Sequence, residues 1–180
     1  MSPLIEMSEK PQPFPSAAQT ERMEMKIYLA GPLFSTAERI TNRELAALIT
    51  QQLPGTEIIL PQDFKHHNEY ASRRWFKEVY VQCIAGIINA DMLVAILDGP
   101  CSDDGTCFEV GYAIAKGKPV IGVRTDFRES QERGMNLMLS QGCTEIVHRP
   151  SFDEDSVSLA RDIARKIKKL QKFNAETMRF

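Results

Sequence analysis

The sequence is organised around the segment Asp98-Gly-Pro-Cys-Ser-Asp-Asp-Gly-Thr-Cys-Phe-Glu-Val-Gly-Tyr-Ala113. The residues before it, Met92 to Leu97, are a continuous apolar run of strand length, and those from Thr106 to Lys116 repeat apolar side chains with a helical period. We therefore predict a strand, an acidic loop and a helix. Ligands of open parallel α/β sheets bind beyond the carboxyl ends of the strands, which makes this loop a candidate functional site.

Composition and charge narrow the class of protein. The 180 residues are 43% apolar and 26% charged, as expected of one soluble globular domain. The net charge of −2 gives no electrostatic reason to expect nucleic acid or an anionic membrane as a partner. The chain has no apolar run of about 20 residues, its first 25 residues lack a signal core, and its four cysteines form no CxxC pair. We therefore expect a cytoplasmic protein with reduced thiols.

Strands and helices alternate along the chain. Strands are expected at 26–30, 57–60, 92–97, 119–123 and 145–147, with helices between them and a last helix that starts at Asp153 or Ser156. This alternation predicts an α/β fold with a five-stranded parallel sheet covered by helices on both faces. Right-handed crossovers favour the flavodoxin-like, doubly wound strand order 2-1-3-4-5. The loops Gly31–Ser35 and Asp98–Gly105 would then share one cleft.

Three further expectations concern single segments. Residues 1–25, rich in proline, are expected to form a disordered or loosely attached arm, and residues 26–180 the α/β domain. Residues 124–133 are expected to form a charged loop. For the helix at 72–89 we expect an inner face made of Trp75, Phe76, Val79, Ile84 and Ile87.

The residues of the predicted cleft exclude some chemistries. Its first loop, Gly31-Pro-Leu-Phe-Ser35, has too few glycines for a dinucleotide fingerprint, and the chain has no Walker lysine. The adjacent His66 and His67 would converge poorly on one metal ion, and no third ligand is spaced to join them, so we expect a solvated loop there.

The polar side chains of the cleft are mainly acidic: Asp98, Asp103, Asp104 and Glu109. Cleavage of a bond to an anomeric carbon uses such a set, because one carboxylate attacks or stabilises the sugar while another acid manages the proton of the leaving group. A Mg²⁺ site and a merely solvated acidic loop are the alternatives for the same residues.

Three motifs carry a resemblance. They are Ile27-Tyr-Leu-Ala-Gly-Pro-Leu-Phe-Ser35, then Asp103-Asp-Gly-Thr-Cys-Phe-Glu-Val-Gly-Tyr-Ala113 with Gly117-Lys-Pro119, and Met135-Asn-Leu-Met138. In this order they resemble the nucleoside 2-deoxyribosyltransferase family over roughly residues 26 to 150. The resemblance implies a flavodoxin-like domain and an enzyme that moves 2-deoxyribose between nucleobases with retention, without a cofactor or a metal ion.

The resemblance also implies roles for individual residues. Glu109 matches the nucleophile that forms a covalent deoxyribosyl intermediate, Tyr28 the tyrosine that orients it, and Asp103 the aspartate that handles protons on the base. Asn136 matches an asparagine that reaches the 5′-hydroxyl of the sugar from a neighbouring subunit, which implies a homo-oligomer. Further candidate substrate-binding residues are Asp98, Gly31, Phe34, Ser35, Gly105 and Met138. Asp98 could equally cap its loop, Tyr28 could simply pack, Asn136 could start a helix, and Asp104 is expected to be solvated.

One departure and two rival functions stay open. Family members with transferase activity often carry an aspartate that helps to hold the base where this chain has Cys83, which we expect to be a small buried residue. The nearest rival is a hydrolase of nucleoside 5′-monophosphates, for which Ser35 and Arg39 could meet the phosphate, although Asn136 favours a free 5′-hydroxyl. A non-catalytic nucleotide-sensing module is the other rival, but an acidic pocket suits phosphates poorly.

Overall fold

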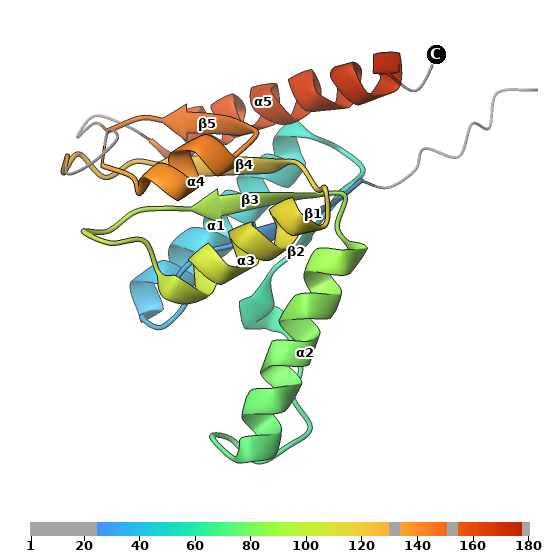
Figure 1. The fold of residues 1–180 in the computed structure, drawn as a ribbon, viewed down its shortest axis with the longest axis vertical. Coiled ribbons are helices and arrows are strands. Elements are labelled where there is room, and N and C mark those ends of the chain that lie inside the picture. Colours follow the sequence, from blue (N-terminus) through green and yellow to red (C-terminus); the bar gives the residue numbers. More distant parts are fainter. Residues whose placement is uncertain (1–24, 130–133, 151–154, 178–180) are drawn as a thin grey trace, which may run out of the picture.

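The computed structural model describes residues 25–129, 134–150 and 155–177 (Figure 1). Five parallel strands form one sheet in the order β2-β1-β3-β4-β5. The strands are β1 (Met25–Ala30), β2 (Thr56–Ile59), β3 (Met92–Ile96), β4 (Val120–Arg124) and β5 (Glu145–His148). The predicted flavodoxin-like topology is confirmed. The boundary of the expected N-terminal arm stays a prediction, because residues 1–24 lie outside the described part of the chain.

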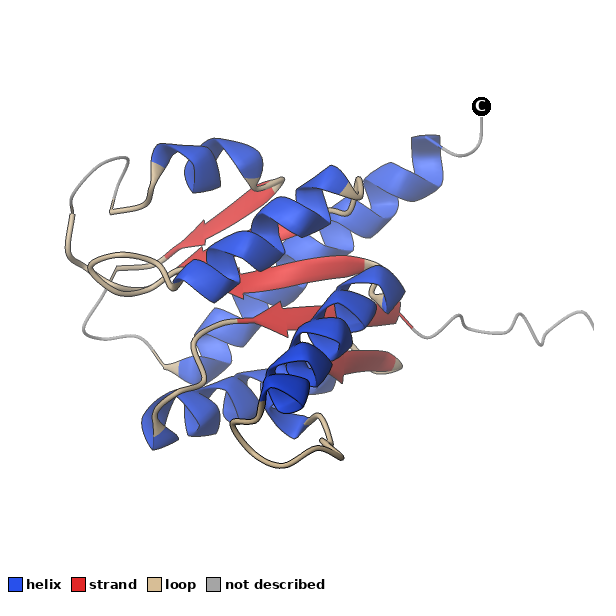
Figure 2. Ribbon diagram, turned by 60° about the horizontal axis from the view of Figure 1, so that its bottom comes forward, coloured by secondary structure: helices blue, strands red, loops and turns tan. Residues whose placement is uncertain are grey.

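Helices cover both faces of the sheet (Figure 2). They are α1 (Thr36–Gln52), α2 (Arg73–Asn89), α3 (Asp104–Ala115), α4 (Leu137–Gly142) and α5 (Ser156–Thr177), with a short 3₁₀ helix, η1, at Pro61–Asp63. Helices α1 and α5 pack against one face, and α2, α3 and α4 against the other. In the described ranges, no helix combines the length and apolar character that crossing a membrane requires.

The alternation of side chains along β1 assigns its residues to the two faces. Ile27 and Leu29 point into the core shared with α1 and α5. Tyr28 and Ala30 point into the core beneath α2 and α3. Tyr28 is 0% exposed, which is unusual for a side chain with a hydroxyl group and requires a polar partner nearby.

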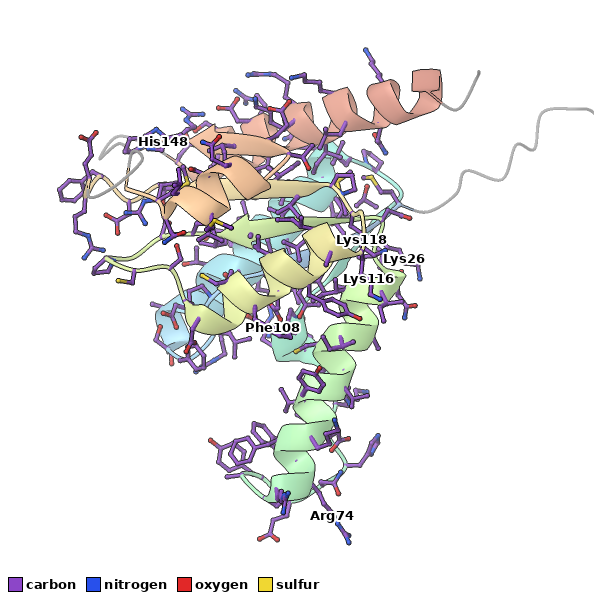
Figure 3. All side chains as sticks on the ribbon, in the orientation of Figure 1. Lys26, Arg74, Phe108, Lys116, Lys118 and His148 are labelled. Atoms are coloured by element: carbon purple, nitrogen blue, oxygen red, sulfur yellow. The ribbon has the colours of Figure 1, made fainter. Side chains whose placement is uncertain are left out.

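Two details differ from the sequence-based expectations. Phe76, expected on the inner face of α2, is 58% exposed. The amino-terminal part of α2 extends beyond the sheet, with Arg74 near its tip, so the sheet does not cover Phe76 (Figure 3). Trp75 beside it is half-buried against the rings of His66 and Tyr70. Arg124, expected to begin a charged loop, instead ends β4 and is 1% exposed. Its burial is possible because backbone carbonyl groups surround its guanidinium, as described below.

Candidate active site

A hydrogen bond between Tyr28 and Glu109 lies where β1 and α3 meet. The Tyr28 hydroxyl donates to Oε1 of Glu109 across 2.6 Å. The two residues are 81 positions apart in the sequence. They meet because β1 and β3 are neighbours in the sheet and the loop after β3 leads directly into α3. The loop after β1 lies against the end of β3, since a Cβ atom built on Gly31 would be 3.2 Å from Cβ of Ile96.

The surroundings perturb both members of this pair. Burial raises the pKa of Glu109, and hydrogen bonds from Tyr28 and from the Cys83 thiol partly offset that rise. The negative charge of Asp103 adds to it. Burial, followed by the charge of Glu109, raises the pKa of Tyr28 far above its usual range. Tyr28 therefore remains a neutral hydrogen-bond donor at physiological pH. Burial disfavours the ionised form of Glu109, and the hydrogen bonds that the carboxylate accepts stabilise that form.

Asp103 joins this region through the start of α3. It is the N-cap residue, and its Oδ2 accepts hydrogen bonds from the backbone N–H of Thr106 (2.7 Å) and from the Thr106 hydroxyl (2.8 Å). An N-cap acceptor satisfies an amide that the helix itself leaves without a partner. Asp104 is exposed, as expected, and accepts from the N–H of Gly105. Asp103 is half-buried and lies six residues before Glu109, and its carboxylate is held by these hydrogen bonds.

Asp98 clamps two loops together. Its Oδ1 accepts from the N–H of Thr125 (2.6 Å) and of Asp126 (2.9 Å), and its Oδ2 accepts from the Thr125 hydroxyl (2.6 Å). Asp98 therefore caps its loop, which is one of the two roles that the sequence left open, and its contact with a base stays a prediction. Arg124 completes this clamp by donating to the carbonyl groups of Leu97 (2.6 Å) and Gly99 (2.8 Å). No role was predicted for Arg124, although an arginine directly after an apolar run is a signal for a buried cation at the end of a strand.

The candidate residues after β1 belong mostly to the start of α1. Ser35 is its N-cap and forms a capping box with Glu38. Arg39 donates to the carbonyl groups of Leu33 and Phe34, at 2.8 Å each. Phe34 itself is 74% exposed. Ser35 and Arg39, the groups that kept a phosphate-binding function open, are therefore engaged in bonds within their own loop.

Asn136 and Met138 lie on the other flank of α3. Asn136 caps α4 by accepting from the N–H of Met138 at 2.9 Å, and Met138 is 78% exposed. Both line a cavity of about 770 Å³ whose other walls include Cys107 and Ile114. Those two side chains stand on the side of α3 that faces away from α2, whereas Glu109 faces α2. Within one chain, Asn136 and Glu109 therefore lie on different sides of α3.

Cys83 lies closer to Tyr28 and Glu109 than the sequence suggested. Its half-buried thiol lies near Tyr28 and Glu109 and shifts the pKa of each, while burial raises the pKa of the thiol itself. All four cysteines of the chain are free thiols.

His66 packs edge-on against Trp75, with ring centroids 5.3 Å apart. Within 25–129, 134–150 and 155–177, no three His, Cys, Asp or Glu side chains are grouped as a metal site would require.

Known proteins resemble this chain in sequence and in fold. The family profile described as nucleoside 2-deoxyribosyltransferase matches residues 27–138. A nucleoside deoxyribosyltransferase from Limosilactobacillus fermentum is 25% identical over 136 residues, which cover 71% of this chain and 81% of that protein. The solved structure of a 2-deoxyribosyltransferase from Bacillus psychrosaccharolyticus is 25% identical, with a TM-score of 0.58 over 75% of this chain and 90% of that chain. A conserved protein from Enterococcus faecalis V583 is 27% identical, with a TM-score of 0.62 over 81% of this chain and 98% of that chain.

The fold and these likenesses define an α/β protein of the deoxyribosyltransferase type. The matched segment covers more than half of the chain and contains Tyr28, Asp103, Glu109 and Asn136. The chain belongs to the nucleoside 2-deoxyribosyltransferase family.

Proposed function

We propose that this chain transfers 2-deoxyribose between nucleobases through a covalent intermediate on Glu109. The observation that carries the proposal is the 2.6 Å hydrogen bond from the buried Tyr28 hydroxyl to the Glu109 carboxylate. It leaves one carboxylate oxygen, Oε2, to attack, while the other is held in place. An acidic group, Asp103, stands at the start of the same helix.

The proposed reaction has two steps. Glu109 attacks the anomeric carbon of a 2′-deoxynucleoside, the glycosidic bond breaks, and Asp103 gives a proton to the departing base. The incoming base then attacks the same carbon, the bond to Glu109 breaks, and Asp103 takes the proton that the new base releases. Two inversions give net retention, and neither step needs a cofactor or a metal ion.

We further propose that the working site is shared between copies of the chain. The support is that Asn136 and Met138 line a cavity beside Cys107 and Ile114, whereas Glu109 lies beside Tyr28 and Cys83 on the other side of α3. In a homo-oligomer, Asn136 from a neighbouring copy would bind the 5′-hydroxyl group. The free thiols and the modest net charge of −2 suit a cytoplasmic enzyme of nucleoside salvage that acts on small molecules.

A product assay tests the proposal against its rival. One sample contains the protein, a 2′-deoxynucleoside and a different free base; a second contains a deoxynucleoside monophosphate without an acceptor. A new deoxynucleoside in the first sample, formed also in the presence of a chelator, supports the transferase. Free base and sugar phosphate in the second sample alone would establish the hydrolase instead. Binding of nucleotides without turnover in either sample would favour the sensing module.

A further inference from the structure

The inner face of α2 lies directly over the ring of Tyr28. A Cβ atom built on Gly86 would be 2.9 Å from Cε2 and 3.1 Å from Cδ2 of that ring. It would also be 3.3 Å from Cζ of Phe64. Contacts below 3.0 Å essentially never occur for real Cβ atoms, so a side chain at Gly86 would force the tyrosine ring to move. Phe64 closes the other side of this space.

The glycine is conspicuous for its place in the helix. Gly86 is buried in the last turn of the 17-residue helix α2, four residues before the C-cap Ala90. Glycine lowers the stability of a helix relative to alanine, so its use there calls for a packing reason. The close approach of α2 to Tyr28 is such a reason.

Cys83 lies three residues earlier on the same face of α2. Its half-buried thiol is near enough to the Tyr28 hydroxyl and the Glu109 carboxylate to shift the pKa of both groups. One face of α2 therefore contacts the pair at two points. Gly86 lies against the ring, and Cys83 lies against the polar atoms.

We propose that Gly86 and Cys83 are positioning residues for Glu109. Gly86 leaves the space in which the ring of Tyr28 lies, so that its hydroxyl reaches the carboxylate. Cys83 holds the hydroxyl and the carboxylate together from the side of α2. The inference rests on the proposed function, because orientation of Glu109 has a catalytic consequence only if Glu109 is the nucleophile.

The first test is Gly86→Ala in two backgrounds. In the wild type, it should lower kcat on the order of tenfold or more with little change in KM, because a displaced hydroxyl no longer bonds to Glu109. The acidic limb of the pH profile should move to higher pH, since a lost donor disfavours the ionised carboxylate. In Tyr28→Phe, the same substitution should have little further effect. An equal fold-loss in both backgrounds would overturn the role of Gly86.

Ala85→Ser is the matched control for this test. It adds one heavy atom to the exposed side of the same helix, next to Gly86. We expect kcat and the pH profile of this variant to stay at wild-type values.

Cys83 is tested by two variants of similar size. Cys83→Ala removes the donor and should move the acidic limb of kcat to higher pH, whereas Cys83→Ser keeps a donor and should move it less. Identical profiles for wild type, Ala and Ser would overturn the role of Cys83. These variants also keep the proposal testable if Gly86→Ala does not fold.

A titration that needs no turnover separates the two hypotheses. The carboxyl carbon of Glu109 is followed by NMR in protein labelled at glutamate, with Glu109→Gln used for assignment. Glu109 should titrate at higher pH in Gly86→Ala and in Cys83→Ala than in the wild type. Unchanged titration in both variants would refute the positioning roles. Absence of turnover in the wild type, with the shifts present, would count against the proposed function alone.

Discussion

The two flanks of α3 differ in how much of the proposed active site a single chain supplies. On the flank that faces α2, Tyr28 donates a hydrogen bond to Glu109, and the Cys83 thiol of the same chain lies beside the pair. On the flank that faces α4, a cavity of about 770 Å³ stays open beside the exposed Met138. The comparison teaches that the proposed nucleophile is organised by a single chain. Binding of the sugar, in our proposal, depends on a second chain.

The largest effect should come from the first flank. Glu109→Ala should reduce transfer by about 10³-fold or more, because no other group can form the covalent intermediate. Steady-state rates measured beside the circular dichroism spectrum would separate lost chemistry from lost fold. Residual transfer within tenfold of wild type would refute the assignment of the nucleophile.

The clamp formed by Asp98 and Arg124 should matter for the stability of the fold rather than for catalysis. Arg124→Leu removes the guanidinium donors to the carbonyl groups of Leu97, Gly99 and Arg128 and should cost about 3 kcal/mol in the free energy of unfolding. Urea denaturation would measure the loss. Arg43→Leu, which removes an exposed ion pair with Asp63, is the control and should cost less than about 1 kcal/mol. Equal losses for the two variants would contradict the clamp.

Asn136→Ala probes the second flank directly. We expect KM for the deoxynucleoside to rise about tenfold, because a hydrogen bond to the sugar is lost. The sharper experiment mixes this variant with Glu109→Ala, so that hybrid oligomers regain intact shared sites. If two-chain sites form by random mixing, about a quarter of them should be intact. Mixtures no more active than the sum of their parts would show that each chain works alone.

The smallest predicted effect is a stabilisation. Burial raises the pKa of Glu109, so the protonated form favours folding below the pKa of the unfolded chain, and that contribution is lost as the pH rises through the folded pKa. Glu109→Gln removes the buried charge and should raise Tm by a few degrees at neutral pH. The gain should shrink in acid. An unchanged Tm difference across pH 4 to 8, measured by calorimetry, would contradict this linkage.

Local sequence patterns were sufficient to predict the fold. Apolar runs of strand length alternating with helical periods predict the elements, and right-handed crossovers predict the strand order, because both depend on short-range geometry. The positions of Tyr28, Asp103 and Glu109 in one region also followed, since β1 and β3 had to be neighbours. Their roles came from resemblance to a family.

Tertiary structure alone decided contacts between residues far apart in the chain. The sequence left two roles open for Asp98, and its bonds to Thr125 and Asp126 depend on how two loops meet at the end of the sheet. Periodicity predicted an inner face for α2 but not that part of the helix would extend beyond the sheet and expose Phe76. The closeness of Gly86 to Tyr28 likewise had no signal in the sequence, because a glycine shows what it leaves room for only once the neighbouring ring is in place.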